Sequence, residues 1–215
     1  MIYTVYSFVN NKVDCHNCWQ SATEYSEEDL SDKSWLITAE RRLANTLLRL
    51  GLEKFFSVVD WDMEIDGHGK PRLVNYTYDG EIHINISHSL GAVAVCLSDT
   101  HQVGIDVQAE IPYDTEMRLK DRFFSDVRAK SEHLDAEFFT LTDDGELVKV
   151  TPDTPDNFDF TDKWAYCESV MKCNGGGFLV SSAINEISKD FLTEIKKINT
   201  REKTFSLAIS IKKPL

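Results

Sequence analysis

The middle of the chain holds two short runs of apolar and β-branched residues, and these runs constrain the fold more than any other feature. Residues 92–97 form the first run, residues 103–107 form the second, and polar residues 98–101 separate them. Runs of this composition and length favour strands, and the polar stretch favours a turn. The pattern predicts a β-hairpin.

The second predicted strand carries two oxygen-bearing side chains on one face. Side chains alternate across a strand, so Asp106 and Gln108 point to one face while Ile105 and Val107 point to the other. One face can belong to the core and the other to a site. Taken alone, these residues fit a strand that simply ends in polar side chains about equally well.

The residues before the first run offer several hydrogen-bond donors in succession. Ser87, His88 and Ser89 supply a hydroxyl, an imidazole and a second hydroxyl. Donors gathered in a small space suit an oxyanion. The alternative is an ordinary loop.

A later segment predicts a helix with a carboxylate and an ammonium on one face. Trp164, Glu168 and Lys172 follow one another at intervals of four residues, and glycines 175–177 end the helix. The structural alternative is a surface ion pair between Glu168 and Lys172, which stabilises a helix by about 0.2–0.5 kcal/mol.

The order of these elements along the chain resembles that of the 4'-phosphopantetheinyl transferases of the larger, two-halved type. The resemblance extends from about Leu36 to about Phe178 and includes residues 122–125. Its elements are Gly69-Lys70-Pro71, Ser87-His88-Ser89, Gly104-Ile105-Asp106, the segment from Trp164 through Glu168 and Ser169 to Lys172, and the glycine run. Several spaced motifs in one order are more specific than any single motif.

The resemblance implies an α+β fold of two pseudo-symmetric halves, each a long helix against a small, mainly antiparallel sheet. The halves would be residues 1–102 and 103–215, with an acidic insertion at about residues 128–162. Coenzyme A would lie in the cleft between them. Since one chain would supply both sides of that cleft, we expect a monomer.

The resemblance also implies an activity and a role for each site residue. The 4'-phosphopantetheine group of coenzyme A would pass to a serine of an acyl or peptidyl carrier protein, releasing adenosine 3',5'-bisphosphate. Mg2+, or Mn2+ in its place, would bind Asp106, Gln108 and Glu168. Glu168 would also accept the serine proton, directly or through a metal-bound water. The coenzyme phosphates would contact Lys70, Ser87, His88 and Lys172.

Two positions depart from the family pattern and keep other functions open. Gln108 stands where an acidic residue is frequent, and Cys167 stands where a lysine is usual. The first change lowers the charge of the metal site, and the second removes a cation near the coenzyme phosphates. One alternative is a homologue that binds coenzyme A or a carrier without catalysis. Another is an unrelated metal-dependent phosphoesterase.

The charge of the chain excludes one class of partner and constrains another. A net charge of −13 argues against nucleic-acid binding, which requires basic surface. An acidic carrier protein would need a local basic patch. The candidates are residues 118–122, or Lys196 and Lys197 with Arg201 and Lys203, although the second group fits a solvated surface equally well.

Several features favour a cytoplasmic protein that does not enter the membrane. No apolar run approaches the roughly 18–20 residues of a membrane span, and the first residues form an apolar strand without the basic start of a signal peptide. The five scattered cysteines suit reduced thiols. Cys15 and Cys18 form a C-x-x-C pair, a spacing found in redox pairs and in halves of zinc sites, but no second Cys/His pair with ligand spacing follows it.

The remaining elements follow from local patterns. Helical spacing predicts an amphipathic helix over residues 35–52, capped by residues 31–32, ending near Gly51 and carrying Arg41, Arg42 and Arg49 on its polar side. Residues 66–71 and 143–145 predict turns, and residues 110–126 a helix with Phe123 and Phe124 in the core or on a docking surface. Residues 204–211 predict a strand.

Overall fold

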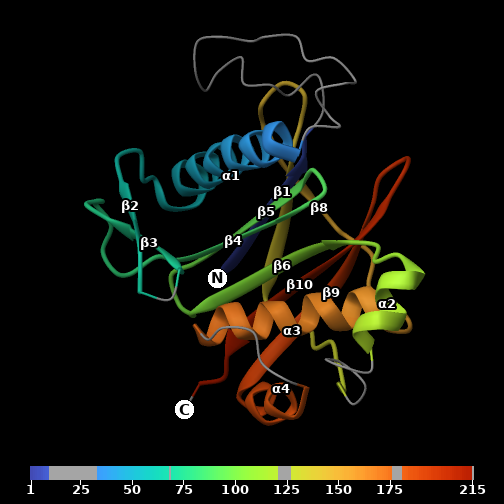
Figure 1. Ribbon diagram of the computed structural model, residues 1–215. Coiled ribbons are helices and arrows are strands. Elements are labelled where there is room, and N and C mark those ends of the chain that lie inside the picture. Colours follow the sequence, from blue (N-terminus) through green and yellow to red (C-terminus); the bar gives the residue numbers. More distant parts are fainter. Residues whose placement is uncertain (10–32, 68, 121–126, 176–180, 215) are drawn as a thin grey trace.

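The computed structural model describes residues 1–9, 33–67, 69–120, 127–175 and 181–214. The helices are α1 (Lys33–Phe56), α2 (Tyr113–Leu119), α3 (Phe160–Asn174), α4 (Ser181–Ile187) and the short 3-10 helix η3 (Ser188–Asp190). The strands are β1 (Ile2–Phe8), β2 (Asp62–Ile65), β3 (Pro71–Val74), β4 (His83–Ser89), β5 (Ala92–Ser98), β6 (Val103–Ala109), β7 (Ala136–Leu141), β8 (Leu147–Val150), β9 (Phe191–Asn199) and β10 (Thr204–Lys212). The fold is α+β. Its two main sheets stack face to face, with α1 outside one and α3 outside the other (Figure 1).

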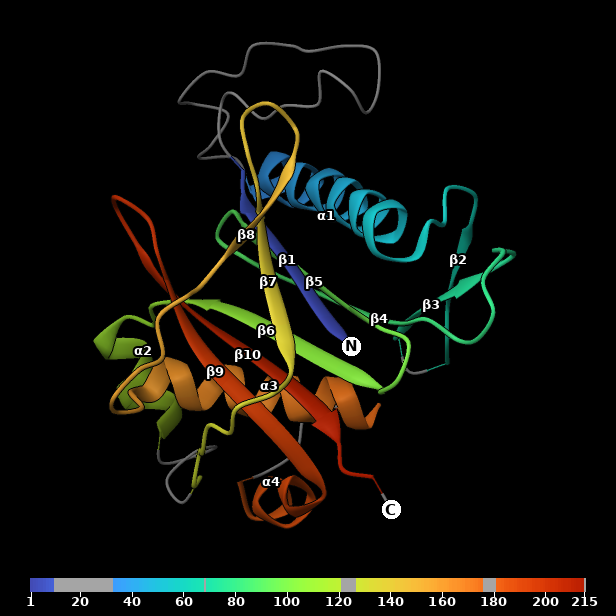
Figure 2. The ribbon, with the colours of Figure 1, turned by 180° about the vertical axis from the view of Figure 1, so that it is seen from behind.

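The larger sheet has five strands in the order β4-β5-β1-β7-β8. β1 pairs antiparallel with β5 and parallel with β7, so this sheet is mixed (Figure 2). Its outer face packs against α1, where Leu47, Leu48 and Leu52 meet Val95 and Leu97 of β5. The amphipathic pattern of α1 therefore serves to cover this sheet.

The smaller sheet has three antiparallel strands in the order β6-β10-β9. Its outer face packs against α3 through Ile195 and Ala208, and its inner face places Leu207 and Ile209 against the larger sheet. The strand predicted over residues 204–211 is confirmed as β10, the central strand.

The predicted hairpin between residues 92–97 and 103–107 is wrong, because β5 and β6 lie in different sheets. All residues of β5 are buried; its odd-numbered apolar side chains face α1 and its even-numbered ones face the smaller sheet. A hairpin strand with one face exposed to solvent would alternate polar and apolar residues. β5 shows no such alternation. The hairpin that does form joins β4 to β5 through Leu90 and Gly91, whose φ angles of 46° and 90° suit a tight turn.

Helix α1 extends to Phe56, so the predicted end near Gly51 is wrong. Gly51 instead lies where α1 approaches the sheet most closely: a Cβ atom there would be 2.8 Å from Leu97 Cδ1. The glycine allows close packing within the helix rather than ending it.

The acidic segment contains strands that join the larger sheet. Its predicted turn is confirmed, since the Gly145 N–H donates to the Thr142 carbonyl at 3.0 Å between β7 and β8. The helix predicted over residues 110–126 is confirmed only over α2, which begins at Tyr113 and ends at Leu119, and residues 121–126 lie outside the described residues. The predictions for Cys15 and Cys18, for the cap at residues 31–32 and for residues 122–125, with Phe123 and Phe124, lie outside the described residues.

The burial of three cysteines and the lengths of the described helices bear on two further features of the sequence. Cys96, Cys167 and Cys173 are buried free thiols, and burial raises the pKa of Cys96 to about 12. Among the helices described, none has both the length and the apolar character needed to cross a membrane.

Candidate functional site

The two sheets meet along a seam between β4 and β6, and side chains rather than a strand ladder hold this seam. β6 pairs with β10 on one edge, which leaves the backbone N–H groups of its other edge to be satisfied differently. Side chains at alternate positions of β4 accept hydrogen bonds from these N–H groups. The bonds run from Ile105 N–H to Asn85 Oδ1 at 2.9 Å, from Val107 N–H to Ser87 Oγ at 3.2 Å, and from Ala109 N–H to Ser89 Oγ at 3.2 Å.

Asp106 lies on this seam and is only 5% exposed. Its Oδ1 accepts hydrogen bonds from Ser87 Oγ at 2.9 Å and from Lys172 Nζ at 2.6 Å. Its Oδ2 is buried, and no donor among the described residues reaches it. Burial raises the pKa of Asp106 above its ordinary value, while Lys172, Ser87 and the nearby His88 oppose that shift. The carboxylate thus has one oxygen engaged and one available.

Helix α3 supplies the second carboxylate, and its start is firmly anchored. Asp159 and Asp162 form a capping box, each side chain accepting the backbone N–H of the other. Asp162 also accepts from Ser206 of β10 at 2.6 Å and pairs with Lys197 of β9 at 2.8 Å. Gly175, with a φ of 75°, ends the helix as predicted.

The close approach of α3 to β6 depends on Gly104. A Cβ atom there would lie 2.1 Å from the Ser169 carbonyl oxygen and 2.4 Å from the Cys173 backbone nitrogen. Only glycine permits this contact, because the obstructing atoms belong to a helix backbone. The contact places one turn of α3 directly over the strand that carries Asp106.

Glu168 and Lys172 reach the same site from α3. Lys172 Nζ also lies 3.0 Å from Ser87 Oγ, so it contacts both Asp106 and its hydrogen-bond donor. Glu168 is half-buried; burial raises its pKa, Asp106 raises it further, and Lys172 opposes the shift. The structure therefore brings together Ser87, Asp106, Glu168 and Lys172 from three elements.

Ser87 and His88 do not form one cluster, because strand alternation sends them to opposite faces of β4. Ser87 faces β6, whereas His88 turns towards α1 and its Nδ1 lies 2.7 Å from Glu40 Oε2. Glu40 is 3% exposed, and its Oε1 accepts the Gly91 N–H at 2.8 Å. The hypothesis of successive donors acting in one small space is thus corrected: the imidazole and the hydroxyls approach the seam from different sides.

Gln108 and Lys70 occupy different surroundings. Gln108 is partly buried on the face of β6 that carries Asp106. Its Nε2 donates to the Ala109 carbonyl at 3.1 Å, a hydrogen bond that does not use the amide oxygen. Lys70 Nζ donates to the Val103 carbonyl at 3.2 Å, and burial lowers its pKa. In this structure Lys70 secures the start of β6.

The donor set fits a magnesium ion. Within the part of the chain that the structure describes, no three His, Cys, Asp or Glu side chains gather at one point. Mg2+ is usually held by only one or two carboxylates, with water and substrate phosphates completing the shell. The site offers two carboxylates, Asp106 with a buried Oδ2 that has no donor among the described residues, and Glu168, whose pKa Asp106 raises.

Two of the four cations in one predicted basic patch, Lys196 and Lys197, are engaged within the molecule, whereas Arg201 and Lys203 are exposed. Lys196 lies 3.0 Å from Glu194, and Lys197 lies 2.8 Å from both Asp159 and Asp162. These lysines are 12% and 17% exposed. They stabilise β9 against its neighbours and offer little charge to a partner.

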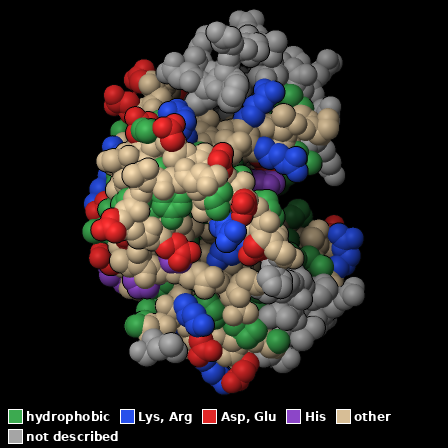
Figure 3. Space-filling model, turned by 90° about the vertical axis from the view of Figure 1, so that its left-hand side faces the viewer, with side chains coloured by type: hydrophobic (Ala, Val, Ile, Leu, Met, Phe, Trp, Pro, Cys, Tyr) green, Lys and Arg blue, Asp and Glu red, His purple; other side chains and the backbone are tan. Residues whose placement is uncertain are grey.

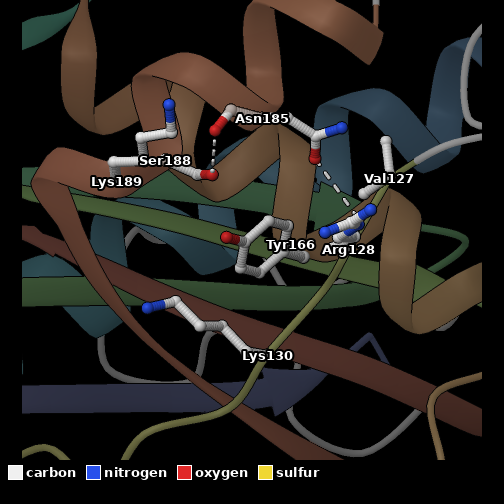
Figure 4. A pocket seen from close by; sticks show the side chains of 7 residues that line it. All are labelled: Val127, Arg128, Lys130, Tyr166, Asn185, Ser188 and Lys189. Atoms are coloured by element: carbon white, nitrogen blue, oxygen red, sulfur yellow. Dashed lines mark hydrogen bonds between the residues drawn. The ribbon is translucent and has the colours of Figure 1, made fainter.

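The molecular surface has a notch between its upper and lower parts, with positively charged side chains near the mouth (Figure 3). A separate pocket of about 650 Å³ lies beside Tyr166 of α3 (Figure 4). Tyr166 and Glu168 are two positions apart on the helix and so project from opposite sides. Two of the pocket's cations are paired, Lys130 with Glu132 and Lys189 with Glu186. The pocket contains none of the predicted site residues.

No protein-family model matches the sequence, and no curated protein matches it. The site therefore has to be interpreted from its own geometry. Two residues of the site were not predicted from the sequence, namely Glu40 behind His88 and Asn85 on the seam. The alternation of Ile84 and Ile86 with Asn85 and Ser87 was the signal for a strand with one polar face.

Proposed function

We propose that this protein transfers the 4'-phosphopantetheine group of coenzyme A to a serine of an acyl or peptidyl carrier protein. The observation that carries the proposal is the convergence of Asp106, Glu168 and Lys172, from a mid-chain strand and a late helix, on one seam between two sheets. The order of motifs in the sequence supports it. In this proposal the chain consists of two pseudo-symmetric halves, residues 1–102 and 103–215, that bind the coenzyme between them.

A divalent ion, Mg2+ or Mn2+, would be held by Asp106 Oδ2 and the Glu168 carboxylate, with the Gln108 amide oxygen as a neutral ligand. When bound, the ion supplies positive charge that offsets the charge on the coenzyme pyrophosphate. Two carboxylates and a neutral oxygen give a weaker site than three carboxylates. Ion and coenzyme should therefore bind more tightly together than separately.

The side chains divide the remaining work. Glu168 accepts the proton of the carrier serine, whose oxygen forms a bond to the pyrophosphate phosphorus nearer the pantetheine. The phosphorus–oxygen bond to the other phosphate breaks, and adenosine 3',5'-bisphosphate leaves. Lys172 exchanges its contact with Asp106 for a contact with the pyrophosphate, and His88 donates to the 3'-phosphate.

Two further residues have supporting roles. Ser87 keeps Asp106 in place. Lys70 fixes the start of β6 before coenzyme binds, and its ammonium then moves from the Val103 carbonyl to a coenzyme phosphate.

The raised pKa of Glu168 suits a proton acceptor. Proton transfer is most efficient when the pKa of the base approaches the working pH, and burial shifts that of Glu168 in this direction. Asp106 is more deeply buried and is already engaged by Ser87 and Lys172, which suits a fixed ligand.

The test is incubation of the protein with a fluorescent coenzyme A, Mg2+ and a panel of apo-carrier proteins. We expect Mg2+-dependent labelling of at least one carrier, and a loss of about 100-fold or more for Glu168→Gln. Glu53→Gln, an exposed glutamate on α1, is the matched control. Saturable coenzyme binding without labelling of any carrier would instead indicate a non-catalytic homologue. Cleavage of a model phosphodiester without a carrier would indicate a phosphoesterase.

A further inference from the structure

The contact between Glu40 and His88 links a buried carboxylate to a solvent-facing imidazole. The Glu40 side chain is 4% exposed and that of His88 is 43% exposed, with Nδ1 2.7 Å from Oε2. A carboxylate accepts hydrogen bonds and donates none, so the proton of this contact belongs to His88 Nδ1. Glu40 therefore fixes both the orientation and the tautomer of the ring.

Glu40 is an unusual residue for its place in α1. It follows the buried Ala39 on the side of the helix that covers the larger sheet. A carboxylate there is costly unless it is paired and hydrogen-bonded. Both of its oxygens are engaged, Oε1 by the Gly91 N–H at 2.8 Å and Oε2 by His88. The first bond joins α1 to the β4–β5 turn, and the second controls a side chain that faces solvent.

We propose that Glu40 is a positioning residue that holds His88 to bind a phosphate monoester through Nε2. With Nδ1–H held by the carboxylate, Nε2 is the nitrogen left to face an incoming ligand. A dianionic phosphate there places the ring between two anions, an arrangement that favours the doubly protonated imidazolium with an N–H on each side. His88 follows Ser87 on β4, and Ser87 bonds to β6, so the phosphate would lie beside the seam.

This inference rests on the proposed function only for the identity of the ligand, the 3'-phosphate of coenzyme A. Glu40→Gln is the sharpest variant, because the glutamine Oε1 can still accept the Gly91 N–H while the charge is lost. The amide nitrogen would donate to Nδ1 and reverse the tautomer of His88. Glu53→Gln on the same helix is the matched control.

The first measurement is the dissociation constant of coenzyme A and of 3'-dephospho-coenzyme A. We expect Glu40→Gln and His88→Ala each to weaken coenzyme A binding about tenfold, the size of one charge-assisted hydrogen bond, and to leave binding of the dephospho form nearly unchanged. Equal effects on both ligands would assign Glu40 a purely structural role and overturn the proposal.

The second measurement does not depend on coenzyme A. Nitrogen NMR of His88 should report protonated Nδ1 in the wild type and a shift on adding inorganic phosphate. In Glu40→Gln the proton should move to Nε2, and the phosphate response should require a higher phosphate concentration because the charge of the carboxylate is lost. A wild-type response to phosphate without coenzyme A binding would support Glu40 and count against the transferase. If the wild type binds coenzyme A and Glu40→Gln binds it equally well, the result would support the transferase and count against the role of Glu40. No phosphate response in the wild type would overturn the role of Glu40.

Discussion

Lys172 Nζ lies 2.6 Å from Asp106 Oδ1, so an ion pair joins α3 to β6 at the centre of the candidate site. The ammonium neutralises the carboxylate through Oδ1, while Oδ2, the proposed metal ligand, has no donor among the described residues. Lys172 thus stabilises Asp106 when no metal is bound, and its side chain, 29% exposed, has room to move when one arrives.

Replacing Lys172 with methionine should destabilise the metal-free protein by about 1.5–3 kcal/mol, because the buried Asp106 loses a charged hydrogen-bond donor. Mg2+ should restore more stability to this variant than to the wild type, since the ion no longer competes with an ammonium. Thermal unfolding with and without Mg2+ measures both effects. Lys189→Met, which removes an exposed lysine paired with Glu186, is the control and should change little. Equal Mg2+ effects on variant and wild type would contradict the prediction.

Alanine at Gly104 should destabilise the protein by about 3 kcal/mol, the upper end of the range for an overpacked core. A Cβ atom there would overlap the Ser169 carbonyl, and helix backbone cannot give way as a flexible side chain can. Separation of α3 from β6 should also abolish carrier labelling. Chemical denaturation measures the stability, with Gly67→Ala as the control because nothing lies within 4 Å of a Cβ atom at that position. Similar stabilities of the two variants would show that β6 and α3 do not meet closely at Gly104.

Alanine at Asn85 should cost about 1–3 kcal/mol, since the buried N–H of Ile105 loses its acceptor. Amide hydrogen exchange should then increase at Ile105 more than at the β10 pairing partners of β6. The control is Asn45→Ala, an exposed position on α1, which should change stability by less than about 0.5 kcal/mol. Unchanged exchange at Ile105 would argue against the seam.

Replacing Glu168 with glutamine should increase the stability of the protein relative to the wild type at neutral pH. Burial and Asp106 raise the folded-state pKa of Glu168 above the model-compound value of 4.5. Between these two pKa values the folded state binds the proton more tightly than the unfolded chain, so wild-type stability falls as pH rises through this window. Below pH 4.5 the carboxyl is protonated in both states, and this difference disappears. Denaturation curves of both proteins in a chelator, at acid and neutral pH, measure the effect; a variant that loses stability relative to the wild type as pH rises would contradict it.

Local periodicity predicted the elements that carry the site better than it predicted how they meet. The spacing of Trp164, Glu168 and Lys172 and the glycines after them correctly indicated α3. Alternation correctly placed Asp106 and Gln108 within one strand, β6. Both patterns depend on neighbours in sequence, which the chain alone determines.

These patterns could not predict which distant segments pair as strands. β5 is apolar throughout because both of its faces are covered, a fact that depends on α1 and on the smaller sheet. The sequence pattern could not distinguish that arrangement from a hairpin. Glu40 was missed for a related reason: an acidic residue in an amphipathic helix usually faces water, and only the tertiary contact with His88 reveals its role.

The three bonds from β4 side chains to β6 have a consequence for how the site can vary. Ladder-paired strands keep a fixed spacing, whereas here the reach of one amide and two hydroxyl groups sets the distance between β4 and β6. Exchanging Ser89 for a longer polar residue would move β6 away from β4 at Ala109. The width of a site on this seam would then depend on the side chains that join the two strands.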